Sequence, residues 1–215
     1  MLHETLLERA LSWLVSTHGE AHLHAARSAF ERATGAITEG QGDYESRIAH
    51  FLEQHLCESD PSPIAAFAAT QPGLLEAERR ELAGWLRSHR SLFVFEGADQ
   101  GVRDLVLGGS YRVWLSDAEQ RLTPGDIFDG RVLPLAELLV LGPGKVFHPR
   151  EAHEALLSLL TQVDFDSLPH AQLLNGLLAM RTRFLTFESV RAEHVYQARA
   201  LAPVHLPLRA EVRGR

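Results

Sequence analysis

The chain has 215 residues, of which 45% are hydrophobic and 23% are charged. This composition is typical of a folded globular protein and excludes a disordered chain, which would be poor in aliphatic residues. The longest apolar runs fall far short of the roughly 18–20 residues that a membrane-spanning helix needs. Acidic residues near the N-terminus argue against a signal peptide. Cys57 is the only cysteine, which excludes an internal disulfide and a Cys-rich zinc site. We therefore expect a cytoplasmic protein that does not bind membranes.

Charge is unevenly distributed along the chain, whose formal net charge is −7. Residues 181–215 hold seven arginines against three glutamates, so the remainder of the chain is strongly acidic. An acidic body disfavours binding to duplex DNA, because cationic side chains drive that binding. The basic end is expected to dock on an acidic surface of a partner or of the protein itself. Docking within the chain is favoured, because opposite charges on one chain attract each other without loss of translational freedom.

The first part of the chain is predicted to be helical. Gly19 separates the first helix from the second, and a glycine-containing polar loop spans 34–43. Asp43 is predicted to cap the third helix with its carboxylate. Apolar residues recur at helical spacing over 2–16, 21–33, 44–57, about 61–69 and 74–89.

The pattern changes to that of strands after residue 90. Tyr111, Val113 and Leu115 alternate with Arg112 and Trp114, which is the two-residue period of a strand. Short strands joined by tight turns predict a small curled antiparallel sheet or barrel over about 91–147, whose edges need closure or a helical cover. The predicted strands are 91–96, 102–107, 110–116, 126–135 and 137–147.

The helical period returns after Pro149, with predicted helices over 150–161 and 168–196. Pro203 and Pro207 exclude helix from the extended basic tail. The predicted fold is therefore α+β, with the sheet packed by N- and C-terminal helices. The expected segments are 1–58 (helical), 59–147 (a helix pair plus the β-barrel module), 148–200 (helical) and 201–215 (the tail).

Six segments carry a family resemblance: Phe51–Glu53, Pro61–Ala66, Leu92–Glu96, Val102–Leu105, Tyr111–Trp114 and Leu122–Val132. Together they resemble a family of uncharacterised bacterial proteins, some members of which carry a Cys-rich zinc-binding tail of the SEC-C type. The resemblance covers about residues 44–160, and its motifs look structural. This chain departs from the zinc-tailed members because its C-terminus has no cysteine, and the resemblance implies no activity.

The histidines between residues 18 and 24 are the sharpest candidate for chemistry. His18 and His22 are four residues apart, a spacing that places two imidazoles on one face of a helix, as a divalent metal site requires. His24 lies nearby. The metalloprotease pattern needs Glu directly after the first His, but Gly19 stands there. A third ligand from elsewhere, such as His50, His55 or Asp43, would complete a site; the alternative is a solvated corner between two helices.

Other motifs carry no convergent chemistry. The segment 142–145 lacks the glycine and the Ser or Thr of a phosphate-binding loop, and we interpret it as a hairpin turn. Asp126 and Asp129 lie three residues apart on a strand and point to opposite faces, so they do not form an acid–base pair. Asp126 is expected to be a turn residue after Pro124-Gly125. No cofactor is predicted.

Two features favour binding to another protein. Arg112 and Trp114 share the outward face of their strand, where the tryptophan would stack on a base or anchor a partner, unless a flanking helix covers it. Helical cover is the favoured alternative, because helices flank the sheet on both sides in sequence. In the tail, Val204, Leu206 and Leu208 recur at spacing two beside Arg209, which is typical of an extended segment with one apolar edge.

The leading hypothesis is therefore a non-enzymatic cytoplasmic adaptor or regulatory subunit that binds another protein. The residues expected to contact the partner are Arg112, Trp114, Val204, Leu206, Leu208 and Arg209. The alternatives are a nucleic-acid-binding protein that uses the β-barrel, and a metal-dependent hydrolase with histidine ligands at His18, His22 and His24.

Overall fold

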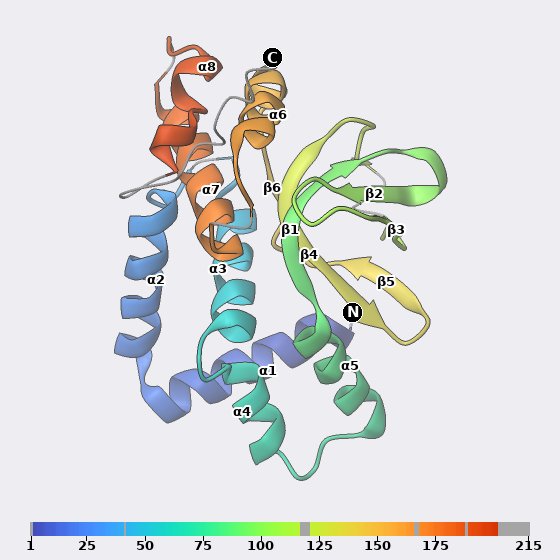
Figure 1. Ribbon diagram of the computed structural model, residues 1–215. Coiled ribbons are helices and arrows are strands. Elements are labelled where there is room, and N and C mark those ends of the chain that lie inside the picture. The colour runs from blue at the N-terminus through green and yellow to red at the C-terminus, as the bar shows by residue number, and fades with distance from the viewer. Residues whose placement is uncertain (1, 41, 117–120, 166–167, 188, 202–215) are drawn as a thin grey trace.

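A computed structural model of the chain describes residues 2–40, 42–116, 121–165, 168–187 and 189–201. The fold is α+β, as the sequence predicts: helices from both ends of the chain pack on a curled antiparallel half-barrel sheet (Figure 1). Within those described ranges, no helix is long and apolar enough to cross a membrane.

The elements follow the order that the sequence pattern predicts. The helices are α1 (Leu2–His18), α2 (Glu20–Thr34), α3 (Tyr44–Glu58), α4 (Pro63–Thr70), α5 (Glu76–Arg87), α6 (His153–Gln162), α7 (His170–Thr186) and α8 (Ala192–Val195). The strands are β1 (His89–Phe95), β2 (Gly101–Asp104), β3 (Ser110–Arg112), β4 (Ile127–Leu135), β5 (Leu138–Leu141) and β6 (Val146–Phe147).

The N-terminal helices form where their apolar stripes predict them. Gly19 separates α1 from α2 and adopts a φ of 78°, a left-handed conformation that glycine reaches without strain. The predicted cap of α3 is wrong in its chemistry. Asp43 stands at the N-cap position, but its side chain makes no capping hydrogen bond. Instead, its Oδ2 lies 2.6 Å from Nη1 of the buried Arg181 on α7. This ion pair takes the carboxylate away from the capping position, since a charged donor binds it more strongly than a backbone N–H does.

Arg47 of α3 holds three segments together. Its guanidinium donates hydrogen bonds to the carbonyl oxygens of Thr34, the last residue of α2, and of Gly35 and Ala36 directly after it. It also donates to Oγ1 of Thr182 on α7. The last carbonyls of a helix lack partners within the helix, and a cation is favourable beside them. Arg47 is 1% exposed, so this side chain caps α2 inside the protein.

The sheet order is β3-β2-β1-β4-β5, with β6 paired to β4, and all these pairs are antiparallel. A single parallel bridge between Trp114 and Val140 links the segment after β3 to β5, on the open side of the half-barrel. Aromatic and branched side chains fill the concave interior, as a small curled sheet requires. They include Phe93, Phe95, Val102, Val113, Leu115, Phe128, Val132 and Leu141.

The predicted strand 137–147 is interrupted, and the prediction of a hairpin turn at 142–145 is wrong. β5 and β6 both pair with β4, one after the other, and residues 142–145 bulge out between them. The Gly144 N–H donates to Glu53 Oε1 at 2.6 Å, and His50 Nδ1 donates to the Gly144 carbonyl oxygen at 2.7 Å. A Cβ on Gly144 would come within 2.5 Å of the His50 backbone, so only glycine allows this approach of α3.

The helices cover one face of the sheet. The outward side chains of β1 and β4 pack under α6, α7 and α8 at one end, and α5 packs on β4 at the other. The strands β2 and β3 project away from the helices, at right in Figure 1. The predicted helix 168–196 is in fact two helices, α7 and α8. Thr186 and Val190 lie at this break, and β-branched residues are weak helix formers.

Candidate functional site

The segment after β3 presents a tryptophan to solvent. Val113 and Leu115 are buried in the half-barrel, so the strand alternation turns Arg112 and Trp114 outward, as the sequence predicts. Trp114 is nevertheless 53% exposed. The expectation that a helix covers it is wrong, because the helices that flank the sheet in sequence pack on β1 and β4 instead.

Backbone pairing holds Trp114 in place. Its N–H donates to the Leu139 carbonyl oxygen at 2.7 Å, and Trp114 lies opposite Val140 in the parallel bridge. Paired residues of a sheet point to the same face, and so do residues two apart on one strand. Leu138, which is 51% exposed, therefore shares the outward face with Trp114.

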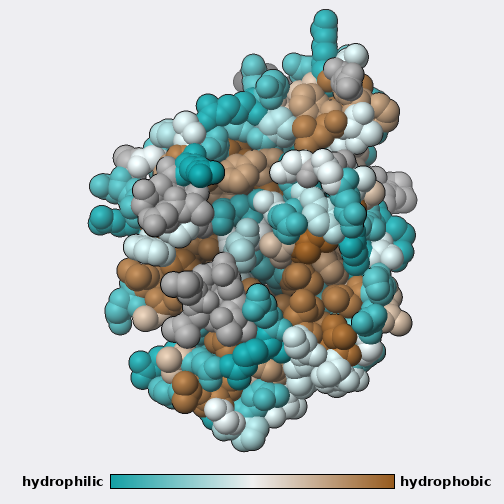
Figure 2. Space-filling view, turned by 180° about the vertical axis from the view of Figure 1, so that it is seen from behind, coloured by the Kyte–Doolittle hydropathy of each residue, from teal (hydrophilic) through white to brown (hydrophobic). Residues whose placement is uncertain are grey.

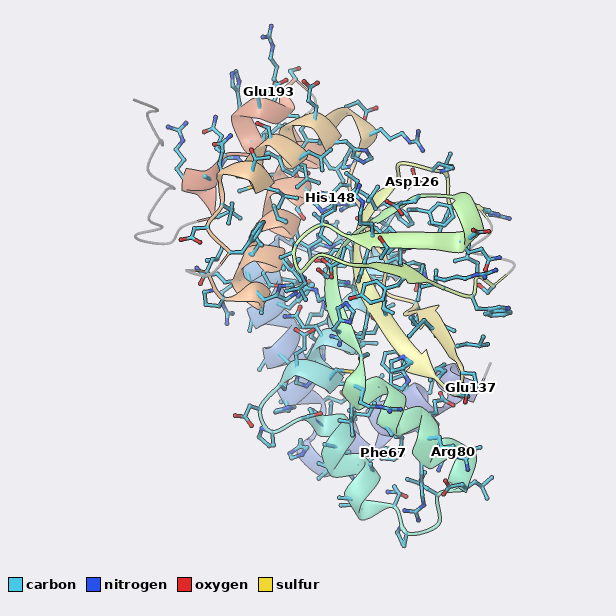
Figure 3. All side chains as sticks on the ribbon, turned by 45° about the vertical axis from the view of Figure 1, so that its right-hand side comes forward. Phe67, Arg80, Asp126, Glu137, His148 and Glu193 are labelled. Atoms are coloured by element: carbon cyan, nitrogen blue, oxygen red, sulfur yellow. The ribbon has the colours of Figure 1, made fainter. Side chains whose placement is uncertain are left out.

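Arg112, Trp114 and Leu138 together define what we call the Trp114 surface. Arg112 is exposed, and in the described part of the chain it forms no ion pair. Leu138 follows the hairpin between β4 and β5, where Figure 3 labels Glu137. Seen from behind, the sheet half of the molecule shows apolar side chains exposed among charged ones, at left in Figure 2. This surface combines a large aromatic side chain, an aliphatic one and an exposed cation.

The predicted histidine site is only partly assembled. His18 ends α1 and His22 begins α2, and their ring centroids lie 5.2 Å apart. The ring centroid of His55 on α3 lies 5.4 Å from that of His22, so His55 is the third histidine of this group. His24 is exposed. Among the described residues, no group of three or more histidine, cysteine or acidic side chains is arranged to hold a metal ion. The metal hypothesis stays a prediction without a ligand set.

The predicted tail contacts cannot be placed. Val204, Leu206, Leu208 and Arg209 lie outside the described residues, which end at Leu201. Their docking on an acidic surface stays a prediction.

Sequence reasoning missed a buried polar group under α3 and α7. Arg90 of β1 and Asp129 of β4 form a two-pronged ion pair, with Nε–Oδ1 at 2.8 Å and Nη2–Oδ2 at 2.6 Å. Arg90 also donates to Asn175 Oδ1 of α7 at 3.0 Å. Next along β4, Arg131 pairs with Glu58 of α3. The signal that was available is the pair of arginines at outward positions of strands that are otherwise apolar.

Burial and charge shift the pKa values of this group in opposite directions. Burial raises the pKa of Asp129, but the charge and hydrogen bond of Arg90, together with the nearby His50, outweigh burial and hold the pKa below its usual range. Burial raises the pKa of Glu53 to about 7 and lowers that of His50 to about 4. His148, which Figure 3 shows between the C-terminal helices and the sheet, has a pKa lowered by burial to about 3. Shifted pKa values often mark active sites. Here all four groups are buried and have contacts within the protein. Asp129 pairs with Arg90, Glu53 and His50 bond the backbone of Gly144, and His148 bonds the hydroxyl of Tyr196. These contacts hold segments of the fold together.

The chain was compared with models of protein families, with curated proteins and with solved structures. No family model, curated protein or solved structure matches it.

Proposed function

We propose that the protein is a non-enzymatic adaptor that binds another protein through the Trp114 surface. The observation that carries the proposal is the 53% exposure of Trp114 on an outward strand face, in a chain whose Trp85 is fully buried. Tryptophan and arginine are the residues most enriched among those that dominate binding energy at protein interfaces. Their combination with an exposed leucine gives an apolar anchor beside a charge.

The chemistry of the surface defines the partner. Arg112 is exposed and forms no ion pair among the described residues, and we expect it to meet a carboxylate of the other protein. Trp114 and Leu138 need an apolar group to cover them. The partner is therefore an acidic protein segment with at least one large apolar side chain next to its carboxylate.

A nucleic acid is the alternative ligand, because tryptophan and arginine also stack on bases. The net charge of −7 opposes it, since a nucleic acid needs cationic contacts to its phosphates. The basic tail stays a predicted second contact with an acidic surface.

Affinity capture from the native host tests this function, with the full chain tagged. Wild type, Trp114→Ala and the control Leu157→Ala are compared, each with and without nuclease. Leu157 is a suitable control because it is 43% exposed on α6, away from β3 and β5. We expect a protein that is retained by the control, lost with Trp114→Ala and insensitive to nuclease. Equal capture by all three proteins contradicts the proposal, and a nuclease-sensitive signal supports the nucleic-acid alternative.

Purified components then give the size of the effect. Loss of an aromatic anchor at an interface weakens binding by about 2 kcal/mol or more, which is roughly a 30-fold rise in Kd. Calorimetric titration of the captured partner with wild type and Trp114→Ala measures this ratio.

A further inference from the structure

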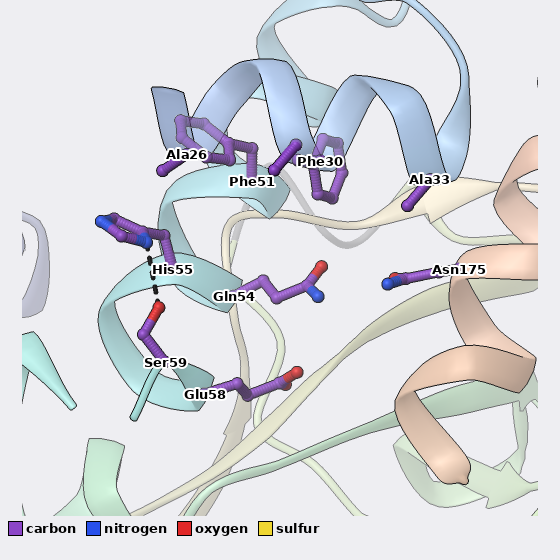
Figure 4. A pocket seen from close by; sticks show the side chains of 10 residues that line it. Ala26, Phe30, Ala33, Phe51, Gln54, His55, Glu58, Ser59 and Asn175 are labelled. Carbon is purple, nitrogen blue, oxygen red and sulfur yellow. Dashed lines mark hydrogen bonds between the residues drawn. The ribbon is translucent and has the colours of Figure 1, made fainter. Parts of the chain in front are cut away.

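An open cavity of about 400 Å³ lies between α2 and α3, and α7 contributes Asn175 to its lining (Figure 4). Its volume is in the range of small-molecule sites. One wall consists of small side chains of α2, including Ala26 and Ala29, together with the rings of Phe30 and Phe51, whose centroids lie 5.6 Å apart. This wall is apolar and suits the flat face of a ring.

The opposite side of the cavity is polar. Figure 4 shows the side chains of Gln54 and Glu58 from α3 and of Asn175 from α7 converging on it. His55 and Ser59 also line the cavity and hydrogen-bond to each other. Polar groups that converge beside an apolar wall can orient a small ligand.

The ion pair behind the cavity fixes the direction of the Asn175 amide. Arg90 donates to its oxygen at 3.0 Å, and a guanidinium can only donate. The oxygen of Asn175 therefore faces Arg90, and its NH₂ group is left on the cavity side, where Figure 4 shows the nitrogen. Asn175 offers the cavity a donor.

Gln54 offers the complementary acceptor. Its Oε1 is buried and has no hydrogen-bond partner within the described part of the chain. A buried polar atom without a partner is unfavourable by about 1–3 kcal/mol. Because the terminal torsion of glutamine is broad, rotation about it can turn this oxygen toward a ligand in the cavity.

The charges around the cavity balance. The carboxylate of Glu58 pairs with Arg131, and Arg90 pairs with Asp129. An ionic ligand would therefore disturb a compensated set and lose its own hydration, with no free counter-charge from the described residues that line the cavity. A neutral ligand fits.

We propose that this cavity binds a neutral, flat small molecule whose edge carries a hydrogen-bond donor next to an acceptor, as a carboxamide or a nucleobase does. The donor of the ligand meets Gln54, its acceptor meets Asn175, and its ring lies against the wall of Ala29 and Phe30. This site is separate from the Trp114 surface and does not depend on the adaptor function.

Nuclear magnetic resonance tests the proposal on the full chain labelled with ¹⁵N. The probes are benzamide and adenine, which distinguish an aryl amide from a nucleobase. Benzoate serves as the charged control and acetophenone as the control that has an acceptor but no donor. Probes of this size bind in the millimolar range. We expect benzamide or adenine to shift the side-chain NH₂ signals of Gln54 and Asn175 in a saturable way, and both controls to bind at least about tenfold more weakly.

Two variants and a matched control complete the test. Gln54→Met removes the acceptor and is expected to weaken binding at least about tenfold, whereas Gln162→Met on α6 leaves binding unchanged. Ala29→Phe fills the cavity and is expected to abolish binding while the unfolding temperature is kept, so it decides the matter if Gln54→Met fails to fold. The proposal is overturned if neither probe shifts the two signals, if benzoate binds as well as benzamide, or if binding survives Ala29→Phe.

Discussion

The outward face of β1 and β4 and the Trp114 surface belong to the same curled sheet, yet they differ in what they bury. Under α3 and α7, the polar side chains Arg90 and Asp129 are 4% and 0% exposed. At the open side, the aromatic Trp114 is 53% exposed. This is the reverse of the usual distribution, in which charged side chains are exposed and large aromatic ones are buried. The first arrangement joins the helices to the sheet, and the second leaves an apolar surface for a partner.

The largest effect on stability is expected from removing the buried ion pair between Arg90 and Asp129. Asp129→Ala leaves Arg90 buried without its anion, so we expect the free energy of unfolding to fall by about 3–5 kcal/mol. Chemical denaturation measures it. Asp126→Ala is the control, because Asp126 lies in a turn, where its Oδ2 accepts from the Thr123 N–H at 2.8 Å. Its loss is expected to be about 1 kcal/mol. Equal losses of unfolding free energy in the two variants would show that the buried ion pair stabilises the protein no more than a turn residue does.

Measuring stability as a function of pH tests a second buried polar group, the carboxyl group of Glu53. Burial raises the pKa of Glu53 to about 7, whereas in the unfolded chain this group titrates near 4.5. Between these pH values the folded state binds more protons, so the contribution of Glu53 to the free energy of unfolding falls as the pH rises. Gln does not titrate. The stability of Glu53→Gln relative to wild type should therefore rise by about 2 kcal/mol from pH 5 to pH 8.

The control for the pH series is Glu45→Gln, which changes an exposed glutamate on the same helix. Its stability relative to wild type is expected to stay level over the same range. Parallel curves for Glu53→Gln and wild type would show that the buried carboxyl group titrates normally.

The smallest effect on stability is expected at the Trp114 surface. Trp114→Ala should change the free energy of unfolding by less than about 1 kcal/mol, because an exposed side chain loses few contacts. Trp85→Ala should lower it by about 3–5 kcal/mol, because Trp85 is fully buried in the helical core. Denaturation curves of both variants give the comparison. A large loss with Trp114→Ala would mean that the residue supports the fold and is not free for a partner.

Local pattern was enough to predict the fold and the outward direction of Trp114. The alternation from Tyr111 to Leu115 predicts that Trp114 points outward, since successive strand residues face opposite sides of a sheet. Whether a helix covers Trp114 depends on how α5 and α7 pack on the sheet, and adjacency in sequence does not contain that information. The favoured expectation of helical cover was wrong for this reason.

Two features depend on contacts between segments that are distant in sequence. One is the interruption between β5 and β6, and the other is the buried polar group. The backbone of Gly144 pairs with Glu53 and His50, which precede it by 91 and 94 residues. Arg90 and Asp129 occupy outward strand positions, where a polar residue normally indicates solvent. They are buried because α3 and α7 cross that face, which local periodicity does not reveal.

Photo-crosslinking in cells tests the central claim, that the Trp114 surface is an interface with another protein. Trp114→p-benzoylphenylalanine places a photoreactive ring on this surface, and the same substitution at Leu157 is the control. We expect one discrete protein adduct from position 114 and none from position 157, with the adduct peptide of the partner containing acidic and large apolar residues. An absence of any protein adduct at 114, or the same adducts from both positions, would contradict the account.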